Sequence, residues 1–141
     1  MPDNEVTVTM KARSQNEAFA RIAAAAFVSA ADPVLSDVTD IKTAVSEAVT
    51  NAIIHGYASD PARDVRMTMR MDGGDIYIEV SDDGAGIEDV ALARQPLYTS
   101  RPELERSGMG FTVMEAFMDS VEVESSPGGG TRVIMRKRLS G

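Results

Sequence analysis

Cysteine and tryptophan are absent from this sequence of 141 residues, and histidine occurs only once. Without cysteine, the chain has no disulfide framework and no thiolate metal site. Long apolar runs are missing too, since none approaches the roughly 20 residues that a membrane-spanning helix needs. Residues 1–5 are acidic and lack the apolar core of a signal peptide. Together these absences predict a protein of the cytoplasm that makes no contact with a membrane.

Positive charge is also scarce, with 14 basic side chains against 22 acidic ones and a net charge of −8. Because binding to a phosphate backbone needs a basic surface, nucleic acid is not expected as a direct partner. The acidic surface would suit a basic protein partner, or it serves only to keep the protein soluble. The hydrophobic content of 43% and the charged content of 26% are typical of a globular protein. The length fits a single domain, residues 1–141, with a core of its own.

Alternating and helical patterns divide the chain into short elements. Period-two alternation predicts strands at residues 6–11, 65–71, 76–80, 121–124 and 131–138. The second and third strands flank the tight turn 72–75 and form a hairpin. Helices are expected after Ser14, from Ser36 to Gly56, and from residues 107–110 through Phe117. This order indicates an α+β fold: a two-layer α/β sandwich whose mixed, mostly antiparallel sheet carries helices on one face.

The first helix is predicted to begin at the N-cap Ser14, with Glu17 completing a capping box. Glu17 and Arg21, one turn apart, suit a surface salt bridge worth roughly 0.3–0.5 kcal/mol. The helix is expected to bury one apolar face, made of Phe19, Ile22, Ala23, Ala26 and Phe27.

The second helix contains the most informative stretch of the chain. At about 100° per residue, its apolar side chains form one stripe: Ile41, Val45, Ala48 and Ala52, flanked by Ala44 and Val49. Glu47, Asn51 and His55 follow one another at intervals of four and form a polar row along the edge of this stripe. Buried polar groups need partners, so such a row suits a ligand cleft. Ordinary surface contacts of the three side chains are the alternative.

Three further sites could bind a ligand. Asp82, Gly84 and Gly86 follow a strand, where glycine lets the backbone approach a ligand and a carboxylate accepts a hydrogen bond from an amine such as that of adenine. Gly108 and Gly110 precede a helix, whose free N–H groups attract an anion. Residues 130–131 start the last strand. Each of these could equally be a plain turn, and the chain has neither a Walker nor a Rossmann glycine motif. Residues 94–107 form a long connection of the kind that often serves as a lid.

In combination and in this order, the motifs resemble the nucleotide site of the GHKL ATPase/kinase superfamily, which includes gyrase and the histidine kinases. The match is closer still to the anti-sigma F factor family of spore-forming bacteria. It rests on residues 46–57, 95–99 and 102–111, with support from 40–43 and 117–119. The resemblance runs nearly from end to end and is weakest at 58–75 and 121–130. It implies a Bergerat-type sandwich that binds ATP or ADP with Mg²⁺.

The resemblance also implies partners and residue roles. Members of this family hold sigma factor F inactive as homodimers and, as serine kinases, phosphorylate an anti-anti-sigma factor. By position, Glu47 matches the catalytic base, Asn51 the Mg²⁺ ligand and Arg106 a lid arginine near the terminal phosphate. Asp82 matches the adenine-reading aspartate, and Arg21 a partner-contacting arginine on the first helix. The other positions that match the nucleotide site are Gly84, Gly86, Ile87, Thr99, Ser107, Gly108, Met109, Gly110 and Thr131.

The sole histidine, His55, lies in the nucleotide-binding helix, and the chain has no room for a separate phosphoacceptor domain. This argues against a complete histidine kinase and for phosphorylation of a partner in trans, with His55 holding the helix end or Tyr57. Two alternatives remain: a binding module that uses ATP only as a conformational switch, and a related kinase that serves a stress-response sigma factor. Glu47 favours a kinase, because a pure binder needs no base there.

Overall fold

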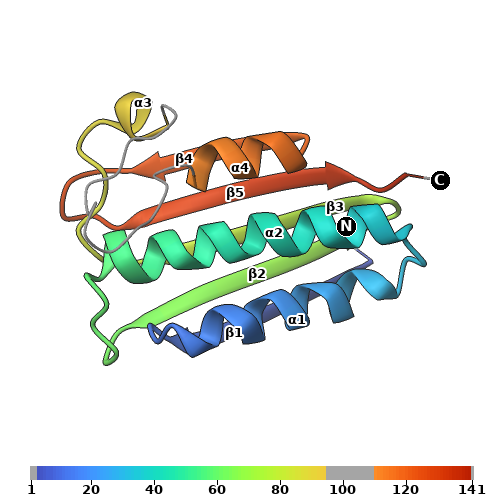
Figure 1. Ribbon diagram of the computed structural model, residues 1–141, viewed down its shortest axis with the longest axis horizontal. Helices are drawn as coiled ribbons and strands as arrows, with labels where there is room; N and C mark the ends of the chain where they lie inside the picture. The colour runs from blue at the N-terminus through green and yellow to red at the C-terminus, as the bar shows by residue number, and fades with distance from the viewer. Residues whose placement is uncertain (1–2, 95–109, 141) are drawn as a thin grey trace.

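The computed structural model describes residues 3–94 and 110–140, which fold into the two layers shown in Figure 1. In chain order the elements are β1 (Asn4–Lys11), α1 (Gln15–Ser29), α2 (Leu35–Asn51), the π-helical turn η1 (Ala52–Gly56), β2 (Asp64–Asp72), β3 (Asp75–Asp82), α3 (Val90–Ala93), α4 (Gly110–Phe117), β4 (Ser120–Ser125) and β5 (Thr131–Arg138). The predicted strands and the three predicted helices are present, whereas the short helix α3 was not predicted. In the described part of the chain, no helix is long and apolar enough to cross a membrane.

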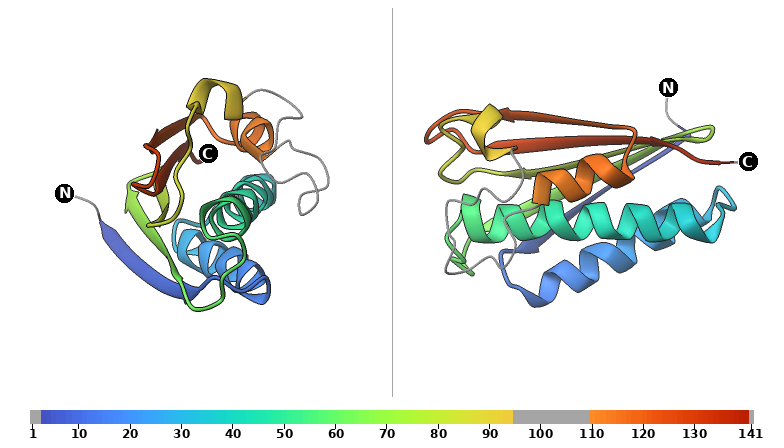
Figure 2. Two further views of the ribbon diagram at one scale, coloured as in Figure 1. Left: turned by 90° about the vertical axis from the view of Figure 1, so that its left-hand side faces the viewer. Right: turned by 45° about the horizontal axis from the view of Figure 1, so that its top comes forward.

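The strands form one sheet in the order β1-β2-β3-β5-β4, with β3 at its centre. Helices α1, α2 and α4 cover one face of the sheet and leave the other face open (Figure 2). The predicted two-layer α+β fold is therefore confirmed. The described sheet is antiparallel at every pairing rather than mixed. One reason is that two helices connect β1 to β2. The chain runs back along α1 and forward again along α2, so β2 returns antiparallel to β1.

The core lies between the sheet and α2, as the alternation along the strands predicted. Val65, Met67 and Met69 of β2, and Ile76 and Ile78 of β3, are each at most 1% exposed. The predicted stripe of α2 is buried against them: Ile41, Ala44, Val45, Ala48, Val49 and Ala52. Burying a side chain of this size contributes roughly 1.5–3 kcal/mol. The stripe therefore fixes the rotation of α2 about its axis, and with it the direction of the polar row.

Helix α1 packs through a different face from the predicted one. Phe19 is 52% exposed and Ile22 is 66% exposed, and Ala26 is exposed as well. The buried side chains of α1 are Ala20, Ala24, Phe27 and Val28. Of the predicted face, Phe27 is buried and Ala23 is partly buried against the core.

A polar contact that the spacing did not reveal explains this rotation of α1. Glu17 accepts a hydrogen bond from the hydroxyl of Ser46 on α2, in addition to the predicted one from Arg21 within α1 (3.2 Å). The contact with Ser46 sets the Glu17 side of α1 against α2. The predicted capping box is wrong for the same reason, because Glu17 faces α2 rather than the helix start. Ser14 has helical dihedral angles, and its side chain caps no N–H group.

Helix α2 continues into the turn η1, in which the Tyr57 N–H donates to the Ala52 carbonyl five residues earlier (3.1 Å). The helical segment ends at Gly56, as predicted, although the left-handed φ values fall on Ala58 (49°) and Ser59 (62°) instead. The need for glycine is steric, because a Cβ on Gly56 would lie 2.7 Å from the carboxylate of Asp82. Turns of this π-helical kind often occur at functional sites.

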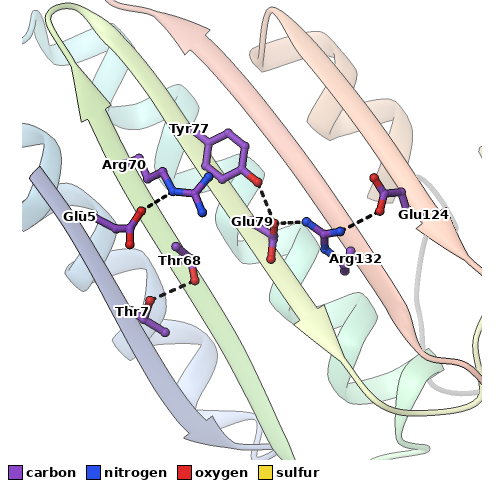
Figure 3. A network of polar contacts seen from close by, with 8 residues as sticks. All are labelled: Glu5, Thr7, Thr68, Arg70, Tyr77, Glu79, Glu124 and Arg132. Carbon is purple, nitrogen blue, oxygen red and sulfur yellow. Dashed lines mark hydrogen bonds and ion pairs between the residues drawn. The ribbon is translucent and has the colours of Figure 1, made fainter. Parts of the chain in front are cut away.

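The open face of the sheet carries a ladder of ion pairs (Figure 3). Arg70 of β2 pairs with Glu5 of β1. Arg132 of β5 contacts Glu79 of β3 at 2.6 Å and Glu124 of β4 at 2.8 Å. Exposed pairs such as these add little to stability one by one, but they balance the arginines of this face with acids.

Candidate functional site

A cavity of about 750 Å³ is bounded by α2, η1, the end of β3, the loop after β3, α3, and the starts of α4 and β5. Its volume lies within the range of small-molecule and cofactor sites. Six of the residues predicted to bind a nucleotide line this cavity: Asn51, Asp82, Gly86, Ile87, Gly110 and Thr131. The fold thus gathers residues from four separate stretches of the sequence onto one wall.

Asp82 ends β3 at the cavity, and its side chain is almost buried, with 6% exposed. Burial raises the pKa of Asp82 from 3.8 to about 6; the N–H of Gly84, which donates to Oδ1 (2.9 Å), lowers this pKa in part, and the charge of Asp83 raises it further. At neutral pH the carboxylate is therefore ionised but poorly solvated. A buried acceptor of this kind gains from a ligand that brings it a hydrogen-bond donor.

Backbone hydrogen bonds lock the loop after β3 between η1 and the turn that joins β4 to β5. The Ala85 N–H donates to the Gly56 carbonyl (2.8 Å), and the Gly130 N–H donates to the Gly84 carbonyl (3.2 Å). A Cβ on Gly84 would lie only 1.9 Å from the Gly56 oxygen. Gly86 has a φ of 75°, and a Cβ there would meet a main-chain oxygen at 1.9 Å. Only glycine allows the three segments to approach this closely, so the backbone itself fixes this part of the cavity wall.

Asn51 and Gly110 form a second polar region of the cavity, separated from the Asp82 region by η1. A Cβ on Gly110 would lie 2.9 Å from Nδ2 and 3.1 Å from Oδ1 of Asn51, so glycine lets α4 begin directly against this side chain. The first N–H groups of a helix have no partner within the helix, and the positive end of the helix dipole lies there. This region therefore offers an amide oxygen and main-chain donors, which together suit a phosphate and its cation.

Three predicted residues are not among the described residues that line the cavity: Gly84, which lies in the loop after β3, Glu47 and Arg21. Glu47 is half-buried on α2, one turn before Asn51, and is not among the described residues that line the cavity. Arg21 lies on α1, with its side chain 40% exposed and paired with Glu17. Their roles stay predictions. The remaining predicted site residues, together with most of the predicted lid, lie outside the described residues: Thr99, Arg106, Ser107, Gly108 and Met109.

His55 lines the cavity from η1, and its structural role also stays a prediction. The next aromatic residue, Tyr57, is 6% exposed. Its hydroxyl donates to the Asp64 carbonyl and accepts from the Asp83 N–H, both at 2.7 Å. Tyr57 thereby ties η1 to β2 and to the residue that follows Asp82. These bonds could not be predicted from the sequence, because they join segments that only the fold brings together.

Ser125 is a second residue of the site that the sequence did not reveal. Its hydroxyl accepts the Ile87 N–H (2.7 Å) and lies 2.8 Å from the hydroxyl of Thr131. It ends β4, where serine and glutamate alternate with valine as in any half-exposed strand. No local motif marks such a position.

Comparison with known proteins places these observations in a family context. Residues 10–137 match the family model described as a histidine kinase-like ATPase domain. The chain is 57% identical over 139 residues to the anti-sigma F factor of Clostridium novyi (strain NT), which covers 99% of this chain and 97% of that protein. It is 54% identical over 138 residues to the anti-sigma F factor of Clostridium perfringens (strain SM101 / Type A), covering 98% and 99% of the two chains.

A solved structure is similar as well. The crystal structure of the RsbU and RsbW domains of Rv1364c from Mycobacterium tuberculosis matches with a TM-score of 0.72 and 23% identity. The match covers 99% of this chain and 34% of that one. At this level of identity, the likeness shows the fold alone.

Proposed function

Because the chain belongs to the histidine kinase-like ATPase domain family and, within it, to the anti-sigma F factors, we propose that it binds ATP and ADP with Mg²⁺, restrains a sigma factor and phosphorylates a protein partner. The observation that carries the proposal is a cavity with two polar regions of different chemistry. The buried carboxylate of Asp82 suits the amino group of adenine. Asn51 and the start of α4 suit the phosphates. The whole chain, residues 1–141, would act as one domain.

The described residues fit a magnesium ion that is held jointly with phosphates. Within residues 3–94 and 110–140, no group of three acidic or histidine side chains is arranged to hold a metal ion by itself. Mg²⁺ commonly keeps most of its ligands as water and phosphate oxygens and takes only one or two from the protein. The Oδ1 atom of Asn51 would be the ligand that this chain supplies.

In the proposed reaction, Glu47 accepts the proton of a serine hydroxyl on the partner. The serine oxygen then bonds to the terminal phosphorus, the bond between that phosphorus and its bridging oxygen breaks, and ADP leaves with the electron pair. The N–H groups at the start of α4, together with Arg106, would stabilise the charge on the phosphoryl oxygens. Bound ATP supplies the phosphoryl group, and Mg²⁺ neutralises part of its charge.

The proposed partners follow from the relatives. Proteins that are 57% and 54% identical over nearly the full chain bear the name anti-sigma F factor. We therefore infer that sigma factor F is the protein restrained and that an anti-anti-sigma factor carries the serine, with the chain acting as a homodimer in the cytoplasm, where sigma factors work. Arg21 is the proposed contact on α1. A stress-response sigma factor is the alternative partner.

A module that uses ATP only as a switch is the second candidate function. One observation favours it: Glu47, the proposed base, is not on the described wall of the cavity. Such a module would change its affinity for the sigma factor when ATP replaces ADP, without transferring a phosphoryl group.

The deciding experiment incubates the protein with an anti-anti-sigma factor and ATP labelled on its terminal phosphate. We expect label on a serine, and we expect Glu47→Gln to bind ATP normally in calorimetry while transferring at least about 100-fold more slowly. Glu122→Gln serves as the matched control, because Glu122 pairs with Arg136 on the open face of the sheet (3.0 Å).

Each outcome separates the candidates. No transfer by the wild-type protein, combined with ATP-dependent capture of the sigma factor, would support the switch. Transfer by Glu47→Gln at the wild-type rate would show that another group takes the proton.

A further inference from the structure

Behind the wall of the cavity, one serine hydroxyl joins separate segments of the site. The Ser125 hydroxyl accepts the Ile87 N–H (2.7 Å), donates to the Gly130 carbonyl (2.9 Å) and lies 2.8 Å from the Thr131 hydroxyl. Ile87 and Thr131 line the cavity, whereas Ser125 is not among the described residues on its wall. Any effect of Ser125 on a ligand must therefore pass through these neighbours.

Counting donors and acceptors in the three contacts assigns the direction of the Thr131 hydroxyl hydrogen. A serine hydroxyl has one hydrogen to donate and accepts two hydrogen bonds. The carbonyl of Gly130 can only accept, so it takes the Ser125 hydrogen, and the Ile87 N–H fills one acceptor position. In the remaining contact Thr131 must donate to Ser125. With its hydrogen given to Ser125, the Thr131 hydroxyl can act toward a ligand in the cavity only as an acceptor.

Asp82 provides a second acceptor beside Thr131. The two residues are paired across β3 and β5, and both line the cavity. Asp82 is 6% exposed and Thr131 is 9% exposed. An ionised carboxylate accepts hydrogen bonds and donates none. The two residues thus offer neighbouring acceptors on a largely buried part of the cavity wall.

We propose that Ser125 is a positioning residue for base specificity: by holding the Thr131 hydroxyl as an acceptor, it makes the cavity select a nucleobase with an amino group over one with a carbonyl oxygen at the same place. The inference rests on the proposed binding of adenine nucleotides and deepens it. A carbonyl oxygen in this place would lose its hydrogen bonds to water and meet only acceptors, which such sites penalise strongly. An amino group would meet acceptors that are already oriented.

The test compares ADP with inosine diphosphate, whose base carries a carbonyl oxygen in place of the amino group of adenine. Affinities for both are measured by calorimetry with Mg²⁺ at about pH 8, where Asp82 is ionised. We expect the wild-type protein to prefer ADP by at least about 100-fold. In Ser125→Ala the Thr131 hydrogen is released and can turn toward the ligand. The ADP affinity should fall about tenfold while the inosine diphosphate affinity stays unchanged, so the preference shrinks by about tenfold.

Three further variants separate positioning from a general structural effect. Ser125→Thr keeps the hydroxyl and is expected to keep the preference for ADP. Ser120→Ala makes the matched change at the exposed far end of β4 and should behave as wild type. Thr131→Val removes the second acceptor and should reduce the preference as Ser125→Ala does. Because Ser125 acts through Thr131, the double variant should show no further reduction.

Equal losses of affinity for the two diphosphates in Ser125→Ala would overturn the proposal, because a merely structural serine would affect both alike. If Ser125→Ala does not fold, an unchanged preference in Thr131→Val overturns it instead. A wild-type protein that binds neither diphosphate would refute the proposed function and this inference together. ADP binding with the same preference in all variants would refute this inference alone.

Discussion

Exchanging Asp82 for Asn is expected to stabilise the nucleotide-free protein at alkaline pH and to abolish its binding of adenine nucleotides. Asn has the shape of Asp, and its Oδ1 can still accept the N–H of Gly84, which lies 2.9 Å from the wild-type carboxylate. The variant therefore removes a buried charge and little else from the free protein. Its amide nitrogen would confront the amino group of adenine with a donor, which explains the loss of binding.

The size of the effect follows from the pKa of Asp82, which burial raises from 3.8 to about 6. This difference corresponds to about 3 kcal/mol between the two protonation states. Below about pH 4 the carboxyl is protonated in the folded and the unfolded chain alike, so Asp and Asn differ little. As the pH rises, the unfolded chain loses this proton first, which favours unfolding. Above about pH 6 the full cost of the buried charge is present.

The measurement is urea unfolding of both proteins, free of nucleotide, at several values from about pH 4.5 to about pH 8. Subtracting one profile from the other cancels the titration of the other carboxylates. The variant should gain stability progressively, up to about 3 kcal/mol, and its thermal midpoint at about pH 8 should rise by roughly 10 °C. A difference that stays constant over this range would refute the argument that burial of the charge carries the cost. Tight ADP binding by Asp82→Asn would refute the assignment of Asp82 as the acceptor.

Further predictions concern the same cavity. The affinity for ADP should fall up to about tenfold per pH unit below about pH 6, because protonated Asp82 no longer accepts the hydrogen bond; calorimetry across this range measures the loss. Gly84→Ala would place a Cβ 1.9 Å from the Gly56 oxygen and should lower the free energy of unfolding by about 3 kcal/mol or more, whereas Gly74→Ala, whose Cβ would meet its nearest atom at 3.8 Å, should change it by less than about 1 kcal/mol. Tyr57→Phe removes both hydrogen bonds of a buried hydroxyl and should cost about 2 kcal/mol in urea unfolding; an unchanged value would show that these bonds do not hold η1 in place.

The fold was predictable where side chains alternate or repeat against a single partner layer. Val65 to Met71 and the stripe around Val45 each meet one continuous apolar surface, so their spacing alone decides which side is buried. Helix α1 was not predictable in this way. Two of its four buried side chains are alanines, and the hydrogen bond from Ser46 to Glu17 sets the Glu17 side of the helix, rather than Phe19, against α2. A tertiary contact of this kind has no signature in the spacing of one helix.

In the candidate site, too, some residues could be predicted from the sequence and others could not. Asn51, Asp82, Gly110 and Thr131 belong to short motifs whose order along the chain resembles a known nucleotide site, and the fold brings them to one cavity. The contacts of Ser125 were not predictable, because its hydroxyl bonds to a residue 38 positions away. The π-helical form of η1 was not predictable either, since a lengthened turn depends on the atoms packed against it.

Because the ion pairs on the open face balance its arginines with acids, the excess of acidic side chains lies on the other surfaces of the protein. The net charge is −8, while Arg66, Arg70, Arg132 and Arg136 of that face each sit beside a carboxylate. A nucleotide, itself an anion, must therefore approach its cavity against the overall field of the protein. Dissolved counter-ions weaken this repulsion beyond about 10 Å, so salt should speed the capture of the nucleotide, the reverse of what is seen for enzymes that draw their anionic substrates in by charge.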